Sequence, residues 1–415
     1  MRPTHTVFSL CGDIGGMNRP GPPPVVAAAA ALAVLFAAGL AGGVTHVSDD
    51  DTPINATIEE RSYLSPAPDE VTRETYVRTG IDLGAAAAAD GQRLRGRHTA
   101  AAFERRFDAA ENRSALVERV AAAIETRALA LDEHHADVLE AYGEGEHTTG
   151  RLLGELARAG AAAREHRRLR DRVETAVEAV DGVEISRTVR ERFVALDAEI
   201  PALESPIVDE LAGAPFDRMT VYTQATETAL VLATAGETHR RRVTLRDERD
   251  RSGPNRFIEG ATGGRNPNSL ALERARSLYG ETRVRGFFPP PLEATSVYGV
   301  QGDTVLGEFV GYIHGSTRNR FHERRVVDSP GLRTQELLDS AGDVELSVET
   351  TAPTGPMRLS VTDETGPIEG VNLSVANTTV GTTDAAGARW VTQPLGGATV
   401  RATVGNETLR VTLPG

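Results

Sequence analysis

The sequence predicts a multidomain protein with an N-terminal signal or anchor helix, an α-helical hairpin or three-helix bundle, a small α+β domain and a C-terminal all-β sandwich. Three observations predict this class: one strongly apolar run near the N-terminus, heptad spacing of apolar residues further along, and apolar–polar alternation towards the C-terminus. A chain of 415 residues is long for one core, and about 150 residues per domain suggests two or three domains.

We expect five segments along the chain. They are a signal peptide or membrane anchor at 1–46, a linker with room for one short strand at 47–83, a helical, coiled-coil-like domain at 84–214, an α+β domain at 215–340 and a β-sandwich at 344–415.

The composition is acidic and free of lysine. Asp and Glu total 59 against 45 Lys and Arg, the formal net charge is −14, and every basic side chain apart from histidine is arginine. A protein that neutralises phosphates needs a net basic face, so we expect no nucleic-acid partner. A self-repelling acidic surface is one means by which halophilic proteins stay soluble. The composition therefore favours a halophilic, archaeal source, with codon bias alone as the alternative.

The apolar run VVAAAAALAVLFAAGLAGGV, residues 25–44, separates a basic end from an acidic one. Arg19 precedes it and Asp49–Asp51 follow it, which is the order of an export signal with everything beyond the run outside the membrane. Its 20 residues suffice to span a bilayer, whereas its alanine-rich composition and the small residues near Ala41 favour cleavage. The sequence leaves both outcomes open, and with them a secreted or a membrane-anchored protein.

Other features support an exported chain. The single cysteine, Cys11, lies ahead of the apolar run, so no disulfide is expected in the exported part. Met1 and Met17 are both possible starts. The candidate N-glycosylation sites, Asn-x-Ser/Thr, all follow the run: Asn55, Asn112, Asn372, Asn377 and Asn406.

The helical domain is predicted by periodicity. Val117, Ile124, Leu131 and Val138 recur every seven residues, as on one face of an amphipathic helix. GEGEHTTG breaks the pattern at 143–150, after which a spacing of three and four resumes in a second helix. Short loops join antiparallel neighbours, so this is a helical hairpin, which the alanine-rich segment before it completes to a bundle.

The period changes to that of strands at about residue 216. RMTVYTQATETALVLATAGETHRRRVTL predicts two or three antiparallel strands. A long polar loop, DERDRSGPNRFIEGATGGRNPNS, is either disordered or functional. SLALERARSLYGE predicts a helix, and the strands then return with HGSTRN as a hairpin turn. The sum is an α+β domain in which a helix covers an antiparallel sheet.

The C-terminal segment has the clearest strand pattern. Met357, Leu359 and Val361 alternate with polar residues, as do three later triplets, which predicts six or seven strands in a β-sandwich. On this pattern Asn372 points away from the core, and Asn377 lies in a turn.

Residues 366–405 resemble the carboxypeptidase regulatory-like group of immunoglobulin-like sandwiches, through the turn GTTDAAG that contains Asp384. This resemblance implies an accessory surface domain without catalytic residues. The helix LERARSLYG, followed by a strand and the hairpin GYIHGSTRNRF, resembles the PepSY group, some members of which are thought to regulate peptidases. Taken whole, the chain resembles an uncharacterised haloarchaeal family of exported surface proteins, which implies location more than activity.

DEHHAD, residues 132–137, is the most conspicuous cluster of possible metal ligands. Adjacent His134 and His135 diverge by about 100° on a helix, and neither has a ligand four residues away, so we expect no shared metal. His166 on the partner helix is expected to be a core histidine. The sequence contains no nucleophile elbow, Walker loop or dinucleotide fingerprint. We therefore assign no catalytic, cofactor-binding or metal-binding residue.

Two basic spots and an aromatic pair have alternative interpretations. His239 with Arg240–Arg242, and Arg324 with Arg325, are expected to pair with nearby acids, and a site for an anionic glycan or headgroup is the alternative. In GFFPPP, Phe287 and Phe288 are expected to pack in a core, with an exposed docking edge as the alternative.

These observations predict a non-enzymatic, exported, membrane-associated surface protein of a halophilic archaeon that acts as a structural or binding module. A regulator of an envelope peptidase is the alternative, and a metal-dependent hydrolase using the histidines is a weaker one. Expected partners are the membrane, through residues 25–44 if they are uncleaved, and other envelope proteins or glycans.

Overall fold

The computed structural model describes most of the chain from residue 64 onward. The described ranges are 64–79, 83–190, 192–193, 205, 207–208, 219–236, 240–247, 249–279, 283–287, 296–304, 307–327, 335–351 and 353–414. Within them, no helix is both long and apolar enough to cross a membrane. The predicted signal or anchor segment, Cys11, Met17 and Asn55 lie outside the described residues.

Three long helices occupy the region of heptad spacing. They are α2 (Leu83–Asp108), α3 (Arg113–Gly143) and α4 (Thr149–Glu178). The side chains of Asn112 and Thr148 cap α3 and α4 by accepting a hydrogen bond from a backbone amide of the first turn. Each cap satisfies an amide that has no partner inside the helix.

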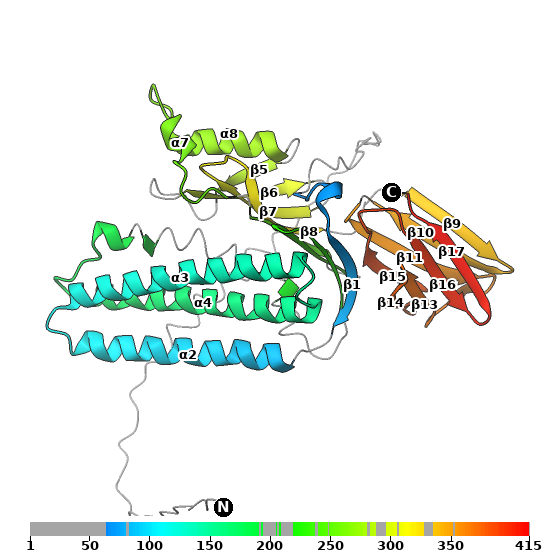
Figure 1. The fold of residues 1–415 in the computed structure, drawn as a ribbon, viewed down its shortest axis with the longest axis horizontal. Coiled ribbons are helices and arrows are strands. Elements are labelled where there is room, and N and C mark those ends of the chain that lie inside the picture. The colour runs from blue at the N-terminus through cyan, green and yellow to red at the C-terminus, as the bar shows by residue number, and fades with distance from the viewer. Residues whose placement is uncertain are drawn as a thin grey trace, which may run out of the picture. The chain divides into compact units, whose positions relative to one another are not determined.

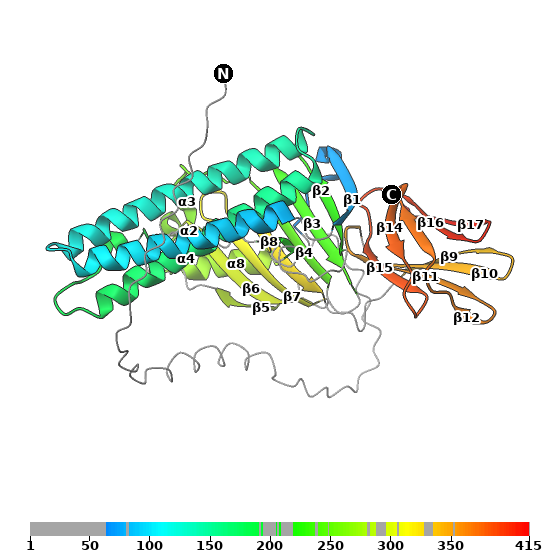
Figure 2. The same cartoon turned by 90° about the horizontal axis from the view of Figure 1, so that it is seen from below.

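The three helices run alongside one another (Figure 2) and share one apolar core. Phe103 and Phe107 of α2 meet Ile124 of α3 and Leu169 and Val173 of α4 there. Three of the four heptad positions, Val117, Ile124 and Leu131, lie in this core, whereas Val138 belongs to a different cluster.

One strand before the helices and seven after them form an eight-stranded antiparallel sheet, in the order β1-β2-β3-β4-β8-β7-β6-β5 (Figure 1 and Figure 2). They are β1 (Arg73–Thr79), β2 (Met219–Ala225), β3 (Ala229–Ala235), β4 (Arg240–Arg246), β5 (Arg283–Phe287), β6 (Val297–Thr304), β7 (Gly307–His314) and β8 (Arg320–Val327). The edge strand β1 lies in the segment predicted as a linker with room for one short strand, and it places Tyr76 opposite Tyr222 of β2.

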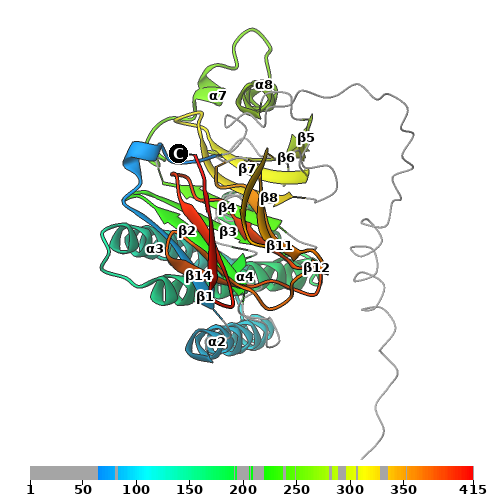
Figure 3. The ribbon, with the colours of Figure 1, turned by 90° about the vertical axis from the view of Figure 1, so that its right-hand side faces the viewer.

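The two faces of the sheet carry different helices. Leu152 of α4 and Tyr142 of α3 pack on one face, against Leu232 and Val243. The short helix α7 (Arg256–Glu259) and α8 (Pro267–Tyr279) cover the other face over β6 and β7. Figure 3 shows α8 and the α3–α4 pair on opposite sides of the sheet.

The helical segment and the sheet thus share a core across the boundary expected between residues 214 and 215. The apolar faces of α3 and α4 are longer than the helical core alone can cover, and their sheet-proximal ends are buried by β2, β3 and β4. Residues Thr57–Gly415 form one compact unit.

The C-terminal sandwich contains a five-stranded and a four-stranded antiparallel sheet. Its strands are β9 (Gln335–Ala341), β10 (Val344–Thr350), β11 (Pro356–Asp363), β12 (Gly366–Pro367), β13 (Asn372–Val375), β14 (Thr378–Thr382), β15 (Ala388–Thr392), β16 (Thr399–Val404) and β17 (Glu407–Thr412). It begins with β9, ahead of the expected start at 344, because β9 pairs along the whole length of β10.

The core of the sandwich extends into the eight-stranded sheet. Tyr76, Tyr222 and Val231 belong to the same apolar cluster as Leu359 and Val391. The Tyr76 hydroxyl donates a hydrogen bond of 2.6 Å to the carbonyl oxygen of Thr392. The two parts therefore contact each other through a buried interface as well as through the connecting chain.

Candidate functional site

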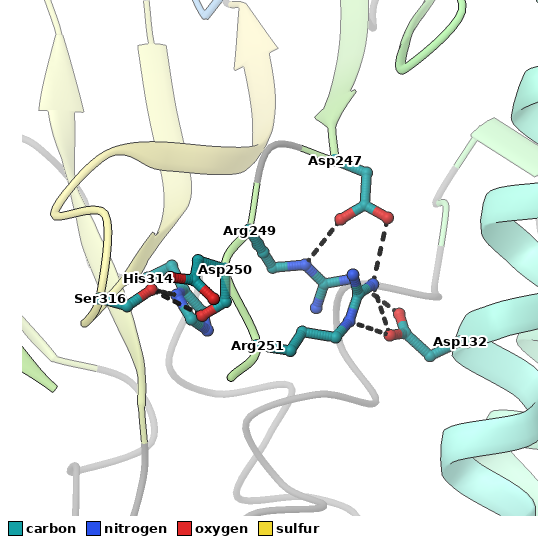
Figure 4. A network of polar contacts seen from close by, with 7 residues as sticks. All are labelled: Asp132, Asp247, Arg249, Asp250, Arg251, His314 and Ser316. Carbon is teal, nitrogen blue, oxygen red and sulfur yellow. Dashed lines mark hydrogen bonds and ion pairs between the residues drawn. The ribbon is translucent and has the colours of Figure 1, made fainter. Parts of the chain in front are cut away.

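Three segments that stand out in the sequence meet at one place in the fold (Figure 4). DEHHAD supplies Asp132 from α3, and the long polar loop after β4 supplies Asp247, Arg249, Asp250 and Arg251. HGSTRN supplies His314, the last residue of β7, and Ser316. They meet because α3 packs on the sheet near the ends of β4 and β7.

Four of these residues form a closed ring of ion pairs, which we call the ionic ring: Asp132, Asp247, Arg249 and Arg251. Arg249 Nη2 is 2.7 Å from Asp132 Oδ1, and its Nε is 3.0 Å from Asp247 Oδ1. Arg251 Nη2 is 2.6 Å from Asp132 Oδ2 and 3.1 Å from Asp247 Oδ2. Each guanidinium therefore bridges both carboxylates.

Three members of the ionic ring are largely withdrawn from water, whereas the Arg251 side chain is 43% exposed. The Arg249 side chain is 5% exposed and that of Asp132 12%. Burial alone would raise the pKa of Asp247, but Arg249 and Arg251 outweigh it and hold that pKa below its usual value. Two carboxylates and two guanidiniums balance, so the ring buries no net charge. It joins α3 to the loop after β4.

Ser316 and His314 form a hydrogen-bonded pair beside the ring. The Ser316 hydroxyl donates to the backbone oxygen of Asp250 at 2.7 Å, and its oxygen is 2.7 Å from His314 Nδ1. Since the hydroxyl proton is used on the carbonyl, His314 Nδ1 is the donor to the serine oxygen. A histidine that donates to a serine cannot act as its general base, so this pair holds the loop and does not form a nucleophile.

Burial and the nearby arginines keep His314 neutral. They lower its pKa to about 4, with burial first, then Arg249 and Arg251. The Asp250 carboxylate accepts hydrogen bonds from the Ser252 hydroxyl and the Gly253 amide, which shapes the start of the long loop. This part of the loop is thus ordered by specific polar contacts.

The other histidines are dispersed. His135 is buried near Asp132, and burial lowers its pKa to about 4. His134 points elsewhere, with Nε2 3.5 Å from Glu155 Oε2 on α4. His166 lines a separate cavity between α2 and α4. Among the described residues, no three His, Cys, Asp or Glu side chains gather as metal ligands.

The two basic spots come together because β4 pairs with β8, with Arg242 opposite Arg325. On the face towards α8, buried Glu323 accepts hydrogen bonds from Arg325 Nε at 2.7 Å and from the Leu64 amide at 3.2 Å. Burial opposes ionisation of Glu323, but the arginines, Arg325 first, lower its pKa overall. Arg240 stacks on Trp390 at 3.6 Å.

The remaining sequence features take various positions. Phe287 is partly buried against the cluster beneath α8, while Phe288 lies outside the described residues. The described sequon asparagines are all exposed: Asn112, Asn372, Asn377 and Asn406. Asn372 lies in β13 between buried Val371 and Leu373, and its side chain points outward as the alternation predicted.

The ionic ring is not predictable from the sequence, because Asp132 and Arg249 are 117 residues apart. The alternating charges of DERDR, at 247–251, were the available signal. Such a pattern in a loop also fits a solvated segment, and nothing in the sequence pointed to Asp132 as its partner.

Two family models match parts of the chain. Residues 25–215 match a domain of unknown function, DUF7096, and residues 337–411 match the archaeal fibronectin-III type-like domain. The comparisons with curated proteins and with solved structures found no match. The second match and the two-sheet topology agree that the C-terminal part is an immunoglobulin-like β-sandwich of an archaeal type.

Proposed function

We propose that this chain is a non-enzymatic structural or binding protein of the archaeal cell envelope. Residues 25–44 would direct it across the membrane, and residues beyond them would act on the outer side, either anchored or released. The observation that carries the proposal is the archaeal fibronectin-III type-like sandwich, whose core continues into the eight-stranded sheet. Domains of this architecture commonly serve as stalks and binding modules on cell surfaces.

The candidate site supports a structural role. In the ionic ring each carboxylate is bound by two guanidiniums, and the Ser316 hydroxyl is used on a backbone carbonyl. Groups that are satisfied in this way fix the packing of α3 on the sheet and are poorly placed to attack a substrate.

The export part of the proposal rests on the sequence. The order of Arg19, the apolar run and Asp49–Asp51 is that of an export signal. The exposed asparagines of the sequons are compatible with glycosylation on the outer side of the membrane.

Two measurements test this proposal. Surface proteolysis of intact cells, with N-terminal sequencing of the mature chain, should find the chain accessible outside and either cleaved near Ala41 or retained in the membrane fraction. A chain that is protected inside intact cells would contradict export.

Affinity capture from envelope extracts addresses the role. Recovery of envelope polymers or structural surface proteins would support a structural or binding module. Recovery of one peptidase in fixed proportion would instead favour the regulator, and stoichiometric metal in the purified protein, with hydrolytic activity, would favour the hydrolase.

A further inference from the structure

The sheet carries a cavity of about 200 Å³ on the face that α3 and α4 pack against. Its lining comes from neighbouring strands. Arg324 of β8 lies opposite Val310 of β7, and Arg241 of β4 lies opposite Val326 of β8. Gln301 of β6 continues the first row. The cavity therefore has a valine floor with arginines on its β4–β8 side.

Charge is distributed unevenly around this cavity. Arg324 Nη2 donates to the Tyr312 hydroxyl at 2.8 Å, and no carboxylate pairs with Arg324 within the described ranges. Its Nε is buried without an acceptor among those same residues. On the opposite side, Arg285 lines the cavity and is ion-paired with Glu308, which also lines it, and with Asp303. One end therefore presents the Arg324 guanidinium, which has no carboxylate partner among the described residues, and the other end presents the Glu308–Arg285 pair and the Gln301 amide.

We infer that this cavity binds an acidic sugar unit, a single pyranose that carries a carboxylate or sulfate group. The acid group would be held by the forked donors of Arg324, with Arg241 beside it. The sugar hydroxyls would donate to Glu308 and Gln301, and the ring would lie over Val310 and Val326. This inference rests on the proposed binding role and names the ligand class for it.

The volume of the cavity and the mixed charge of its lining favour an acidic sugar over other ligands. Pockets for drug-sized ligands have volumes of roughly 300–1,000 Å³, so the present cavity admits only a small group. The lining sets one carboxylate, Glu308, and one amide, Gln301, among the arginines, so hydroxyl groups beside an acid group find acceptors that an extended polyanion would leave unused. A compact ligand with an acid at one end and hydroxyl groups at the other matches both ends of the cavity.

Titration of the purified full chain with glucuronate tests the inference, with ligand-observed saturation-transfer NMR and calorimetry as readouts. Glucuronate should bind, and glucose should bind at least about tenfold more weakly, because it lacks the charge-assisted hydrogen bonds to Arg324. Arg324→Gln should lower glucuronate affinity by about the same factor. The matched control Arg151→Gln, at an exposed arginine of α4, should leave the affinity unchanged.

Two further variants guard against misfolding. Arg241→Gln should also weaken glucuronate binding, and Arg324→Lys should have an intermediate effect because lysine keeps the charge but loses the fork. Circular dichroism must show each variant folded.

Absence of glucuronate binding to the wild-type chain, or equal binding by folded Arg324→Gln, would overturn the inference. So would binding of vesicles of anionic lipid without binding of glucuronate. If the chain still captures envelope material in any of these cases, the acidic-sugar site is wrong while the proposed function stands. If the chain binds neither glucuronate nor envelope material, the acidic-sugar site and the proposed function are both wrong.

Discussion

At the scale of single residues, the ionic ring shows how a charged site can serve packing. Removing charges from water is costly, and only complete pairing offsets the cost. Asp132 and Asp247 each contact both guanidiniums, so the geometry meets that condition. The four ion pairs form together only when α3 packs on the loop in this one arrangement, so the ring favours this arrangement over others.

We therefore expect Arg249→Gln to lower the free energy of unfolding by about 3 kcal/mol, because it leaves buried Asp132 and partly buried Asp247 with the more exposed Arg251 alone. Urea denaturation followed by circular dichroism measures this. Arg93→Gln, which removes an exposed pair with Asp90, should change stability by less than about 1 kcal/mol. If the two variants behave alike, the ring does not stabilise the fold. In a double-mutant cycle of Arg249→Gln with Asp132→Asn, the two losses in the free energy of unfolding should not add.

His135 gives a second prediction at this scale. Its pKa is about 4 in the folded chain against 6.5 as the ordinary value. Between these values the unfolded chain takes up a proton that the folded chain does not, so the stability present above pH 6.5 is lost as the pH falls towards 4. The loss attributable to His135 approaches about 3 kcal/mol.

Urea titrations from pH 7 to pH 4.5 check this. His135→Gln should make the acid slope shallower, although His314 and His322, whose pKa values are also lowered, leave part of it. His134→Gln, at the half-exposed neighbour, should keep the wild-type slope. An unchanged slope in His135→Gln would contradict the assignment.

At the scale of elements, the end of α3 makes a close contact with the sheet. Tyr142 is fully buried, and its hydroxyl is hydrogen-bonded to Thr223 of β2 at 2.8 Å and to Thr149 of α4 at 3.1 Å. At Gly143, a Cβ atom would lie 2.2 Å from the carbonyl oxygen of Thr226. The hairpin can approach β2 this closely only because residue 143 has no side chain.

Substitution of two helical glycines by alanine tests this contact. Gly143→Ala should destabilise the fold by about 1–3 kcal/mol through displacement of backbone. Gly91→Ala in α2, where only the end of the flexible Arg95 side chain lies within 4 Å, should be neutral or stabilising by up to about 1 kcal/mol through helix propensity. Opposite signs in thermal unfolding are expected, and a stabilising Gly143→Ala would contradict the close approach.

At the scale of the whole molecule, charge and continuity of the core govern stability. The net charge of −14 implies mutual repulsion among surface acids. Salt shortens the screening length from about 10 Å at 0.1 M to about 3 Å at 1 M. The ionic ring, being buried, should be screened much less than the surface.

We therefore expect Tm to rise by several degrees between dilute buffer and molar KCl, as the notion of a halophilic chain requires. Differential scanning calorimetry measures it, and a neutral osmolyte at equal osmolality controls for solvent exclusion. Equal Tm values in dilute buffer and in KCl would argue for codon bias as the origin of the composition.

The shared cores explain why the sequence predicts the helices but not the surfaces that cover them. Val117, Ile124 and Leu169 predicted helices because a helical period is visible along one chain. The partner of Val138, by contrast, is the β2–β4 part of a sheet formed about 80 residues later. Periodicity shows that a face is apolar but not what covers it, so the helical and α+β segments appeared separable.

The sequence by itself determined the local elements: three helices, antiparallel strands, a C-terminal sandwich with outward-facing Asn372, and an acidic, lysine-free character. Only the tertiary structure decided which of them pair. It placed β1 at the sheet edge, joined DEHHAD to the DERDR loop in the ionic ring, and set Arg324 beside Arg241 on one face. Local elements follow from short-range periodicity, whereas these sites depend on strand order and helix docking between distant segments, which no short stretch encodes.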